Sequence, residues 1–318
     1  MNLIKSCDIK KTFTLTTNFE EELKNLAMDI EVIIFGHTFN ESVDKLPTSV
    51  KDLTFGWTFN QSIDNLPNNL TKLTFGGNFN QSVDNLPNSL TDLVFGENFK
   101  KSVDNLPDSL KRLKLGYQFN KPVNNLPQSL THLTFGHRFN QSIKKLPKNL
   151  TSLIFGYIFN QSVDNLPDSL KEITFGEKFN CAVNNLPINL KHLNFGNSFN
   201  KPIDNLPLKL THLTVGNDFN QTVNNLPINL THLTFGNEFN KKVDCLPENL
   251  IALIFGTNFN QSIDNLPNLL KYITFGEKFN QIVHNLPMNI EEIKIFENND
   301  HLFIKIPFGC NIIKMDQI

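Results

Sequence analysis

The sequence is poor in the features that mark a disulfide-rich secreted protein, a membrane protein or a metal-binding protein. It has only four cysteines, and their spacing fits neither a metal site nor a disulfide framework. No apolar run approaches the about 18–20 residues that a membrane span needs. The N-terminus lacks the apolar segment of a signal peptide. These absences favour an intracellular protein without a membrane segment.

The sequence also shows no excess of one charge. The formal net charge is −2 at pH 7 and no long run of one sign occurs. A general phosphate-binding surface would need clustered lysine and arginine, so nucleic acid is not an expected partner. No nucleophile–base set, phosphate loop or pair of acids stands apart from the rest of the sequence. We therefore predict that the protein is not an enzyme and uses no cofactor.

Proline and glycine are nearly confined to one repeating pattern. Of the 16 prolines, 13 stand in a Leu-Pro pair that recurs every twenty residues from Leu46-Pro47 to Leu286-Pro287. Of the 15 glycines, 13 occupy the position of Gly76 in the reference repeat, Leu66–Asn85. A fixed period predicts a stack of coils in which each repeat contacts mainly its neighbours. Since almost no proline or glycine is left to mark a linker, we predict one solenoid domain over residues 1–318.

This predicted domain has three parts. Residues 1–30 are a polar lead-in and an atypical N-terminal cap, and residues 31–290 carry the twenty-residue repeats. Residues 291–318 form a degenerate C-terminal cap, since the terminal repeats of a solenoid are usually atypical. We expect the twenty-residue register to continue through this cap, which would place Ile313 and Met315 in strand positions.

Within one repeat, the pattern predicts a short strand and an extended return. Leu73-Thr-Phe75 alternates with period two, which is typical of a strand. We expect Gly76 to end the strand by turning at positive φ, and Pro87 to fix φ at the opposite corner. Phe79 and Leu86 would also fit a helical stripe, but the space allows only an extended segment or a short 3₁₀ turn. The predicted fold is a mainly β solenoid, a right-handed stack of coils with one parallel sheet of about 16 short strands.

An asparagine follows the second phenylalanine of most repeats, as Asn60 and Asn80 do. A dozen equivalent asparagines argue against one catalytic residue. We predict that each side chain faces inward and hydrogen-bonds the backbone of its own or the next coil. Several of them begin an Asn-Gln-Ser acceptor for N-glycosylation. A glycan on an inward side chain would prevent folding, which favours the cytoplasm over a secreted route.

The repeated motif Leu-Pro-x-x-Leu-x-x-Leu-x-Phe-Gly-x-x-Phe-Asn-x-x-Val, over residues of about 30–290, resembles the FNIP repeat. That family is a relative of the leucine-rich repeats and is found in amoebae and in the large DNA viruses that infect them. The resemblance implies a leucine-rich-repeat-like fold, and a location in the host cytoplasm if the protein is viral. Some members resemble ubiquitin-ligase adaptors with an F-box before the repeats. An adaptor without its own F-box is therefore one alternative function.

Function is expected where the repeats differ, at outward strand positions and just after each strand. Arginine, tyrosine and exposed aliphatic residues gather between residues 112 and 158, and these residue types are typical of protein interfaces. The candidate partner-binding residues are Trp57, Arg112, Lys114, Tyr117, His132, His137, Arg138, Ile154, Tyr157 and Ile158. We predict an interaction scaffold that binds another protein through the strand face. The main alternative is a structural or self-assembling repeat protein whose variable positions have no partner.

His192, His212 and His232 stand twenty residues apart. Adjacent strands would place their imidazoles in a row about 4.8 Å apart. Three imidazoles can bind a transition metal, but straight strands do not converge ligands on one point. We interpret the row as a solvated ladder and predict no metal site. A ligand binder that uses this row, or the threonines at the Thr74 position, is a third hypothesis.

Overall fold

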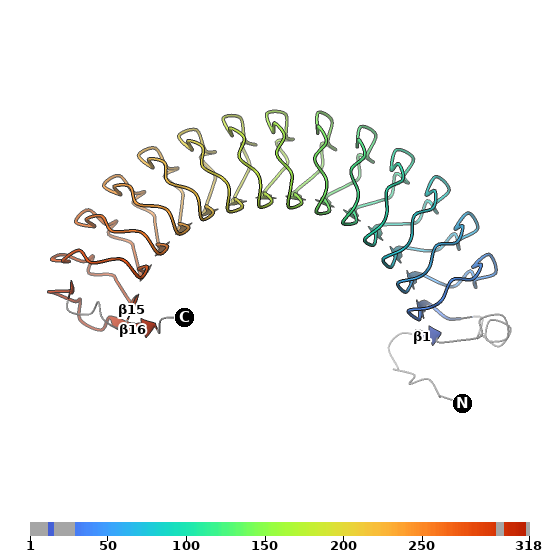
Figure 1. Ribbon diagram of the computed structural model, residues 1–318, viewed down its shortest axis with the longest axis horizontal. Helices are drawn as coiled ribbons and strands as arrows, with labels where there is room; N and C mark the ends of the chain where they lie inside the picture. The colour runs from blue at the N-terminus through green and yellow to red at the C-terminus, as the bar shows by residue number, and fades with distance from the viewer. Residues whose placement is uncertain (1–11, 16–28, 297–301, 316–318) are drawn as a thin grey trace. The chain divides into compact units, whose positions relative to one another are not determined.

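The computed structural model describes the backbone of residues 12–15 and all of residues 29–296 and 302–315 (Figure 1). The N-terminal cap predicted for residues 1–30 lies almost wholly outside this described part. The chain forms two compact units, residues 1–157 and residues 158–318, and each is described by itself. We call them unit 1 and unit 2.

Unit 1 contains eight strands among its described residues. They are β1 (Thr12–Leu15), β2 (Val32–Phe35), β3 (Asp52–Thr54), β4 (Lys72–Thr74), β5 (Asp92–Val94), β6 (Arg112–Lys114), β7 (His132–Thr134) and β8 (Ser152–Ile154). Each strand pairs in parallel with the strand of the next coil, so residues twenty apart are partners, as Leu73 and Leu93 are.

Unit 2 also contains eight strands among its described residues. They are β9 (Glu172–Thr174), β10 (His192–Asn194), β11 (His212–Thr214), β12 (His232–Thr234), β13 (Ala252–Ile254), β14 (Tyr272–Thr274), β15 (Glu292–Phe296) and β16 (Asn311–Met315). From β9 to β15 the pairing is parallel with the same twenty-residue register.

The return side of each coil is extended and turns twice, and the described residues contain no α-helix. Figure 1 shows each coil as one narrow loop of the chain, with successive loops stacked along each unit. The predicted fold class, a mainly β solenoid of short parallel strands, is confirmed. None of the described residues form a helix with the length and apolarity that a membrane crossing requires.

The last coil departs from the predicted register. β16 pairs with β15 so that Ile312 lies opposite Ile293, and Met315 lies opposite Phe296. The partners are nineteen residues apart in this pair, so the expectation that Ile313 would continue the Ile293 position is wrong. The pairing extends over five residues here, against three in the regular coils. At this end of unit 2 the two strands pair over more residues, and the twenty-residue register of the regular coils is lost.

The core consists of the apolar positions that the repeat predicts. In the reference repeat, Leu73, Phe75 and Phe79 are buried, and so are their equivalents in the other regular coils except Phe39, which is half-buried. The rings of Phe75 and Phe79 stack within one coil at 3.7 Å, and Phe79 stacks on Phe59 of the preceding coil at 6.0 Å. Each ring is therefore covered above and below by equivalent rings, which no single coil could supply.

The glycines serve a different purpose from the one predicted. Among the described glycines only Gly309 has a positive φ, at 82°, so the expectation of a left-handed turn at Gly76 is wrong. A β-carbon on Gly76 would instead lie 2.0 Å from the carbonyl oxygen of Gly56 in the preceding coil. Glycine is needed because two backbones pass too closely there for any side chain.

The Leu-Pro corner closes through a backbone hydrogen bond. The amide of Leu70 donates to the carbonyl oxygen of Pro67 at 3.1 Å, and the same bond recurs in the other regular coils. Pro67 lacks an amide hydrogen and has a fixed φ, so it starts this turn without leaving a donor unpaired. The next amide, that of Thr71, donates to the carbonyl oxygen of Lys51 in the preceding coil and begins the strand ladder.

The asparagine ladder forms, but it does not lie inside the solenoid. The amide of Asn80 donates to Oδ1 of Asn60 at 2.9 Å, as predicted for a bond between coils. Asn60 itself is only half-buried, and no polar side chain is buried in the described ranges. The prediction of inward-facing asparagines is therefore wrong, and the glycan argument against secretion loses its premise. These side chains bond to backbone at the rim of the coils.

Candidate functional site

The candidate face of unit 1 is made by the outward residues of β6, β7 and β8 and by the turns that follow them. Arg112 and Lys114 point outward from β6, and His132 lies beside Arg112 on β7. Ile154 on β8 is 41% exposed although it is a large aliphatic residue. Side chains of a strand point alternately inward and outward, so the first and third residues of each of these strands reach this face.

Three aromatic rings form a column beside these strands. Tyr117, His137 and Tyr157 occupy the same position in three consecutive coils. The rings of Tyr117 and His137 stack at 4.3 Å, and those of His137 and Tyr157 stack at 4.6 Å. Tyr117 is 40% exposed and Tyr157 is 42% exposed. The column presents two partly exposed tyrosine rings, which suits a protein interface.

His137 is the central ring of this column. Its Nδ1 is buried and is the one buried side-chain nitrogen or oxygen without a hydrogen-bond partner in the described part of the chain. A buried polar atom without a partner destabilises the fold unless it serves another purpose. The stacking of two tyrosine rings on His137 contributes about 0.5–1.5 kcal/mol per pair and offsets this cost.

The candidate face is electropositive. Arg112, Lys114 and Arg138 lie on this face, and the sequence between residues 109 and 163 has no aspartate or glutamate. Arg112 pairs with Asp92 on the neighbouring strand. Burial works to raise the pKa of Asp92, but hydrogen bonds from Thr91 and Arg112 and the charges of Arg112 and Lys72 together hold it below its ordinary value. The remaining cations of this face, such as Lys114 and Arg138, have no acidic residue nearby in the sequence. The face therefore favours an acidic partner surface.

Trp57 lies apart from the column. Its ring stacks on His37 of the preceding coil at 6.2 Å. On the other side it covers Gly77, where an added β-carbon would lie 2.6 Å from the indole. The tryptophan is 43% exposed. Two coils without an aromatic residue at this position separate Trp57 from Tyr117, so the structure does not join all the predicted residues into one patch. Ile158 belongs to unit 2.

In unit 2 the histidine row forms as predicted. The rings of His192 and His212 meet edge to face at 4.6 Å, and those of His212 and His232 stack at 4.3 Å. Burial, and then the charges of His232 and His192, lower the pKa of His212 below its ordinary value. Nδ1 of His212 lies 2.9 Å from the hydroxyl of Thr211, and Nδ1 of His232 lies 2.9 Å from the hydroxyl of Thr231. In the described ranges no three histidine, cysteine or acidic side chains gather to hold a metal ion.

Sequence reasoning missed two features of the surface. It named Tyr117, His137 and Tyr157 without recognising that they stack, although their twenty-residue spacing was the available signal. It also missed an exposed aliphatic row at the Leu-Pro corner of unit 2, where Ile188 and Leu208 are 63% and 71% exposed and Ile228 follows. The equivalent positions of unit 1 carry polar residues, so an alignment of the repeats would have found this row.

The repeats match a known family. A model described as FNIP Repeat matches residues 42–78, 59–97, 102–138, 139–178, 179–218 and 239–278, which together make up more than half of the sequence. The chain belongs to the FNIP repeat family. The resemblance seen in the sequence is therefore confirmed. No curated protein matches the sequence.

Solved structures place this FNIP repeat chain among the leucine-rich repeats. CroV588, described as a novel circular LRR protein, is 44% identical, with a TM-score of 0.81 over 91% of this chain and 47% of its own. The functional domain of InlJ from Listeria monocytogenes is 13% identical, with a TM-score of 0.56 over 79% of this chain and 60% of its own. TLR13, solved in a complex with ssRNA13, is 16% identical, with a TM-score of 0.52 over 84% of this chain and 54% of its own.

These likenesses bear on the fold more than on function. The FNIP repeat chain spans about half the length of CroV588, and its identity to InlJ and TLR13 is low enough to show the fold alone. Leucine-rich-repeat solenoids commonly use their extended faces for protein–protein interaction, and they are typically non-enzymatic scaffolds.

Proposed function

We propose that this FNIP repeat chain is a non-enzymatic scaffold that binds an acidic protein surface through the strand face of unit 1. One observation carries the proposal. The position of Tyr117, His137 and Tyr157 holds a stacked and exposed column of rings, whereas the same position in unit 2 holds glutamate, asparagine and threonine. Rigid aromatic residues are over-represented among the residues that dominate binding energy.

The charges around the column support a specific kind of partner. Lys114 and Arg138 lie in an acid-free stretch of the sequence, and Arg112 is the one cation of this face with a described ion pair. Complementary charge mainly steers association and fixes orientation, while the ring column would supply the buried contacts. We therefore expect capture of the partner to weaken as salt concentration rises.

The experiment replaces the column by the side chain that unit 2 uses. In the test variant Tyr117, His137 and Tyr157 become asparagine. The matched control changes Lys178, Asp218 and Lys278 of unit 2, one residue after the position equivalent to the column, to alanine. We expect capture of partner proteins from the native cell extract to fall at least tenfold for the test variant, since a loss of about 1.4 kcal/mol suffices.

Thermal melts are run on both variants, because the column itself contributes stacking energy. A test variant that melts normally and still retains every partner would contradict the proposal and favour a purely structural or self-assembling role. Equal loss of partners from both variants would also contradict it, because the binding would then not be specific to unit 1.

A further inference from the structure

The asparagine ladder of unit 1 is interrupted at one coil. In the regular coils, Oδ1 of Asn60 accepts the amide hydrogen of Asn80 at 2.9 Å and the side-chain amide of Gln81 at 3.2 Å. At the equivalent position of the fourth regular coil the residue is Lys100, which has no acceptor on its side chain. The ladder loses one acceptor here and gains one cation.

Several donors are left without acceptors around this interruption. Lys100 donates its backbone amide hydrogen to Asn80 Oδ1 at 2.9 Å. In the next coil the backbone amide of Asn120 has no such acceptor among the described residues, because lysine replaces asparagine at position 100. Lys101 and Lys121 stand where most other coils have glutamine. In the described part of the chain the three ammonium groups have no hydrogen bond and no ion pair.

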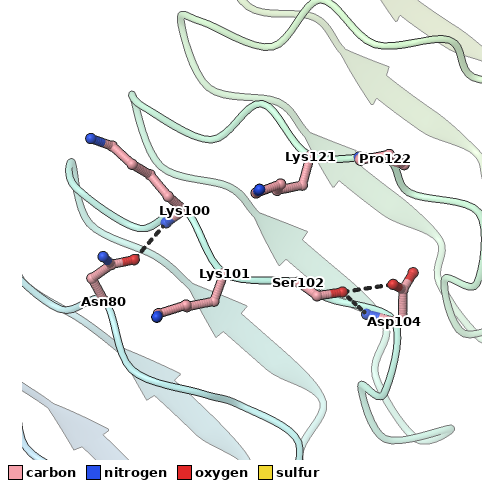
Figure 2. A pocket seen from close by; sticks show the side chains of 7 residues that line it. All are labelled: Asn80, Lys100, Lys101, Ser102, Asp104, Lys121 and Pro122. Carbon is pink, nitrogen blue, oxygen red and sulfur yellow. Dashed lines mark hydrogen bonds between the residues drawn. The ribbon is translucent and has the colours of Figure 1, made fainter.

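These groups line a pocket of about 480 Å³ that opens to solvent (Figure 2). Its lining includes the three lysines together with Asn80, Ser102 and Asp104. Figure 2 shows the side chains of Lys100 and Lys101, from one coil, and of Lys121, from the next coil, around this pocket. The one acidic group, Asp104, accepts a hydrogen bond from the hydroxyl of Ser102 at 2.7 Å and is turned toward that residue.

One side of the pocket belongs to an acid-free part of the sequence. Lys121 lies inside the acid-free stretch of residues 109–163, which holds eight lysines and arginines. Ammonium groups that line one pocket repel one another unless an anion lies between them. The protein supplies only one carboxylate to this pocket, and that carboxylate is already hydrogen-bonded.

We propose that this pocket binds a small anion of the phosphate class. Its oxygens would accept hydrogen bonds from the ammonium groups of Lys101 and Lys121, which line the pocket. They would also accept one from the backbone amide of Asn120, which lacks its ladder partner and directly precedes Lys121 in the chain. Charge-assisted bonds from ammonium to phosphate oxygen are among the strong hydrogen bonds of proteins, and a free backbone amide adds direction. A monocarboxylate would offer one charge and two oxygens, too few for this set of donors.

The test uses the full chain with inorganic phosphate and with pyrophosphate as probes, at constant ionic strength set with sodium chloride. Binding is measured by calorimetry, and the backbone amide of Asn120 is followed by NMR. We expect saturable binding and a shift of the Asn120 signal. The variant Lys100→Asn restores the ladder acceptor, so it should fold and should lose at least tenfold in affinity. Lys101→Gln with Lys121→Gln should lose as much.

The matched control is Lys201→Gln with Lys241→Gln in unit 2. Those lysines occupy the same position as Lys101, but the ladder beside them is intact, since the amide of Asn220 donates to Asn200 Oδ1. The control should bind as the unchanged protein does. Equal binding by the Lys100→Asn variant would overturn the proposal. So would an effect that chloride reproduces at the same ionic strength, because it would reflect screening alone.

Discussion

Units 1 and 2 are built from the same coil but carry different side chains on their surfaces. At the position after each strand, three coils of unit 1 carry the stacked rings of Tyr117, His137 and Tyr157. The same position in unit 2 carries an amide ladder, in which Asn197 donates from its side chain to Glu177 at 2.9 Å, and the amide of Asn217 donates to Asn197. Neither solution disturbs the phenylalanine layers below, so this position can change with function while the fold is kept.

The opposite corner of the coil shows the reverse distribution. In unit 2 the residue after the Leu-Pro pair is aliphatic and exposed in three consecutive coils, at Ile188, Leu208 and Ile228. In unit 1 the same position carries threonine, asparagine, aspartate, glutamine and lysine. At these two positions, unit 1 places its unusual residues on the strand side, and unit 2 places them on the corner. The two units share a framework and differ in what they display.

The largest effect should come from a position that both units share. We expect Gly116→Ala in unit 1 and Gly216→Ala in unit 2 each to lower the free energy of unfolding by about 3 kcal/mol, because the added carbon would meet backbone. In the two cases that carbon would lie 1.7 and 2.1 Å from the carbonyl oxygen of the preceding coil. Denaturant unfolding of both variants measures the loss.

The control is Gly77→Ala, whose added carbon has its three nearest neighbours in the partly exposed indole of Trp57. A flexible side chain at the surface can move aside, so this change should cost less than about 1 kcal/mol. A large loss in one unit and a small loss in the other would show that the framework is not common to both.

Much of this fold follows from periodicity, because a strict twenty-residue repeat identifies the inward positions without knowledge of the backbone. Leu73, Phe75 and Phe79 were predicted in that way. The purpose of Gly76 could not be, since it depends on how closely two coils approach. The last coil also escaped prediction, because Ile312 and Ile313 are equally apolar and only the observed pairing distinguishes them.

The candidate site was predicted only in part for a similar reason. Residue types pointed to Tyr117 and Tyr157, but stacking depends on side-chain conformations that a sequence does not contain. The lysine pocket was harder still. Lys100 stood out as a departure from asparagine, yet its consequence lies in the amide of Asn120, one coil away. A missing acceptor is visible only once the ladder that needs it is known.

The second prediction removes one acceptor from the asparagine ladder of unit 2, as Lys100 does in unit 1. Asn200→Ala removes an acceptor that receives the amide of Asn220 at 3.0 Å and the side chain of Gln221 at 2.8 Å. We expect a loss of about 1–2 kcal/mol in the free energy of unfolding, because the donors lie at a half-buried rim that water reaches in part. The control, Asn225→Ala, removes one long exposed bond to Asp204 and should be nearly neutral. Equal losses would mean that the ladder contributes little.

The third prediction is the reverse change in unit 1. Lys100→Asn supplies the acceptor that the amide of Asn120 lacks, and it removes one of three neighbouring positive charges. We expect a gain of about 0.5–1 kcal/mol in phosphate-free buffer, from one net hydrogen bond and reduced repulsion. Lys100→Ala, which removes the charge without adding an acceptor, separates the two contributions. If Lys100→Asn is no more stable than Lys100→Ala, the backbone amide of Asn120 does not need the missing acceptor.

The smallest effect concerns pH and belongs to unit 2 alone. Burial and the flanking imidazoles lower the pKa of His212 in the folded state below its ordinary value of 6.5. As pH falls through that value the unfolded chain takes up a proton at this residue before the folded chain does, so the folded state loses stability until the lower folded pKa is passed. His212→Gln removes this dependence. We therefore expect denaturation midpoints measured at pH 7.5 and pH 5 to differ less for His212→Gln than for the unchanged chain. Ala252→Gln, in the same row but without loss of an imidazole, should keep the full difference; an equal pH dependence in all three proteins would show that the histidine row does not couple folding to protonation.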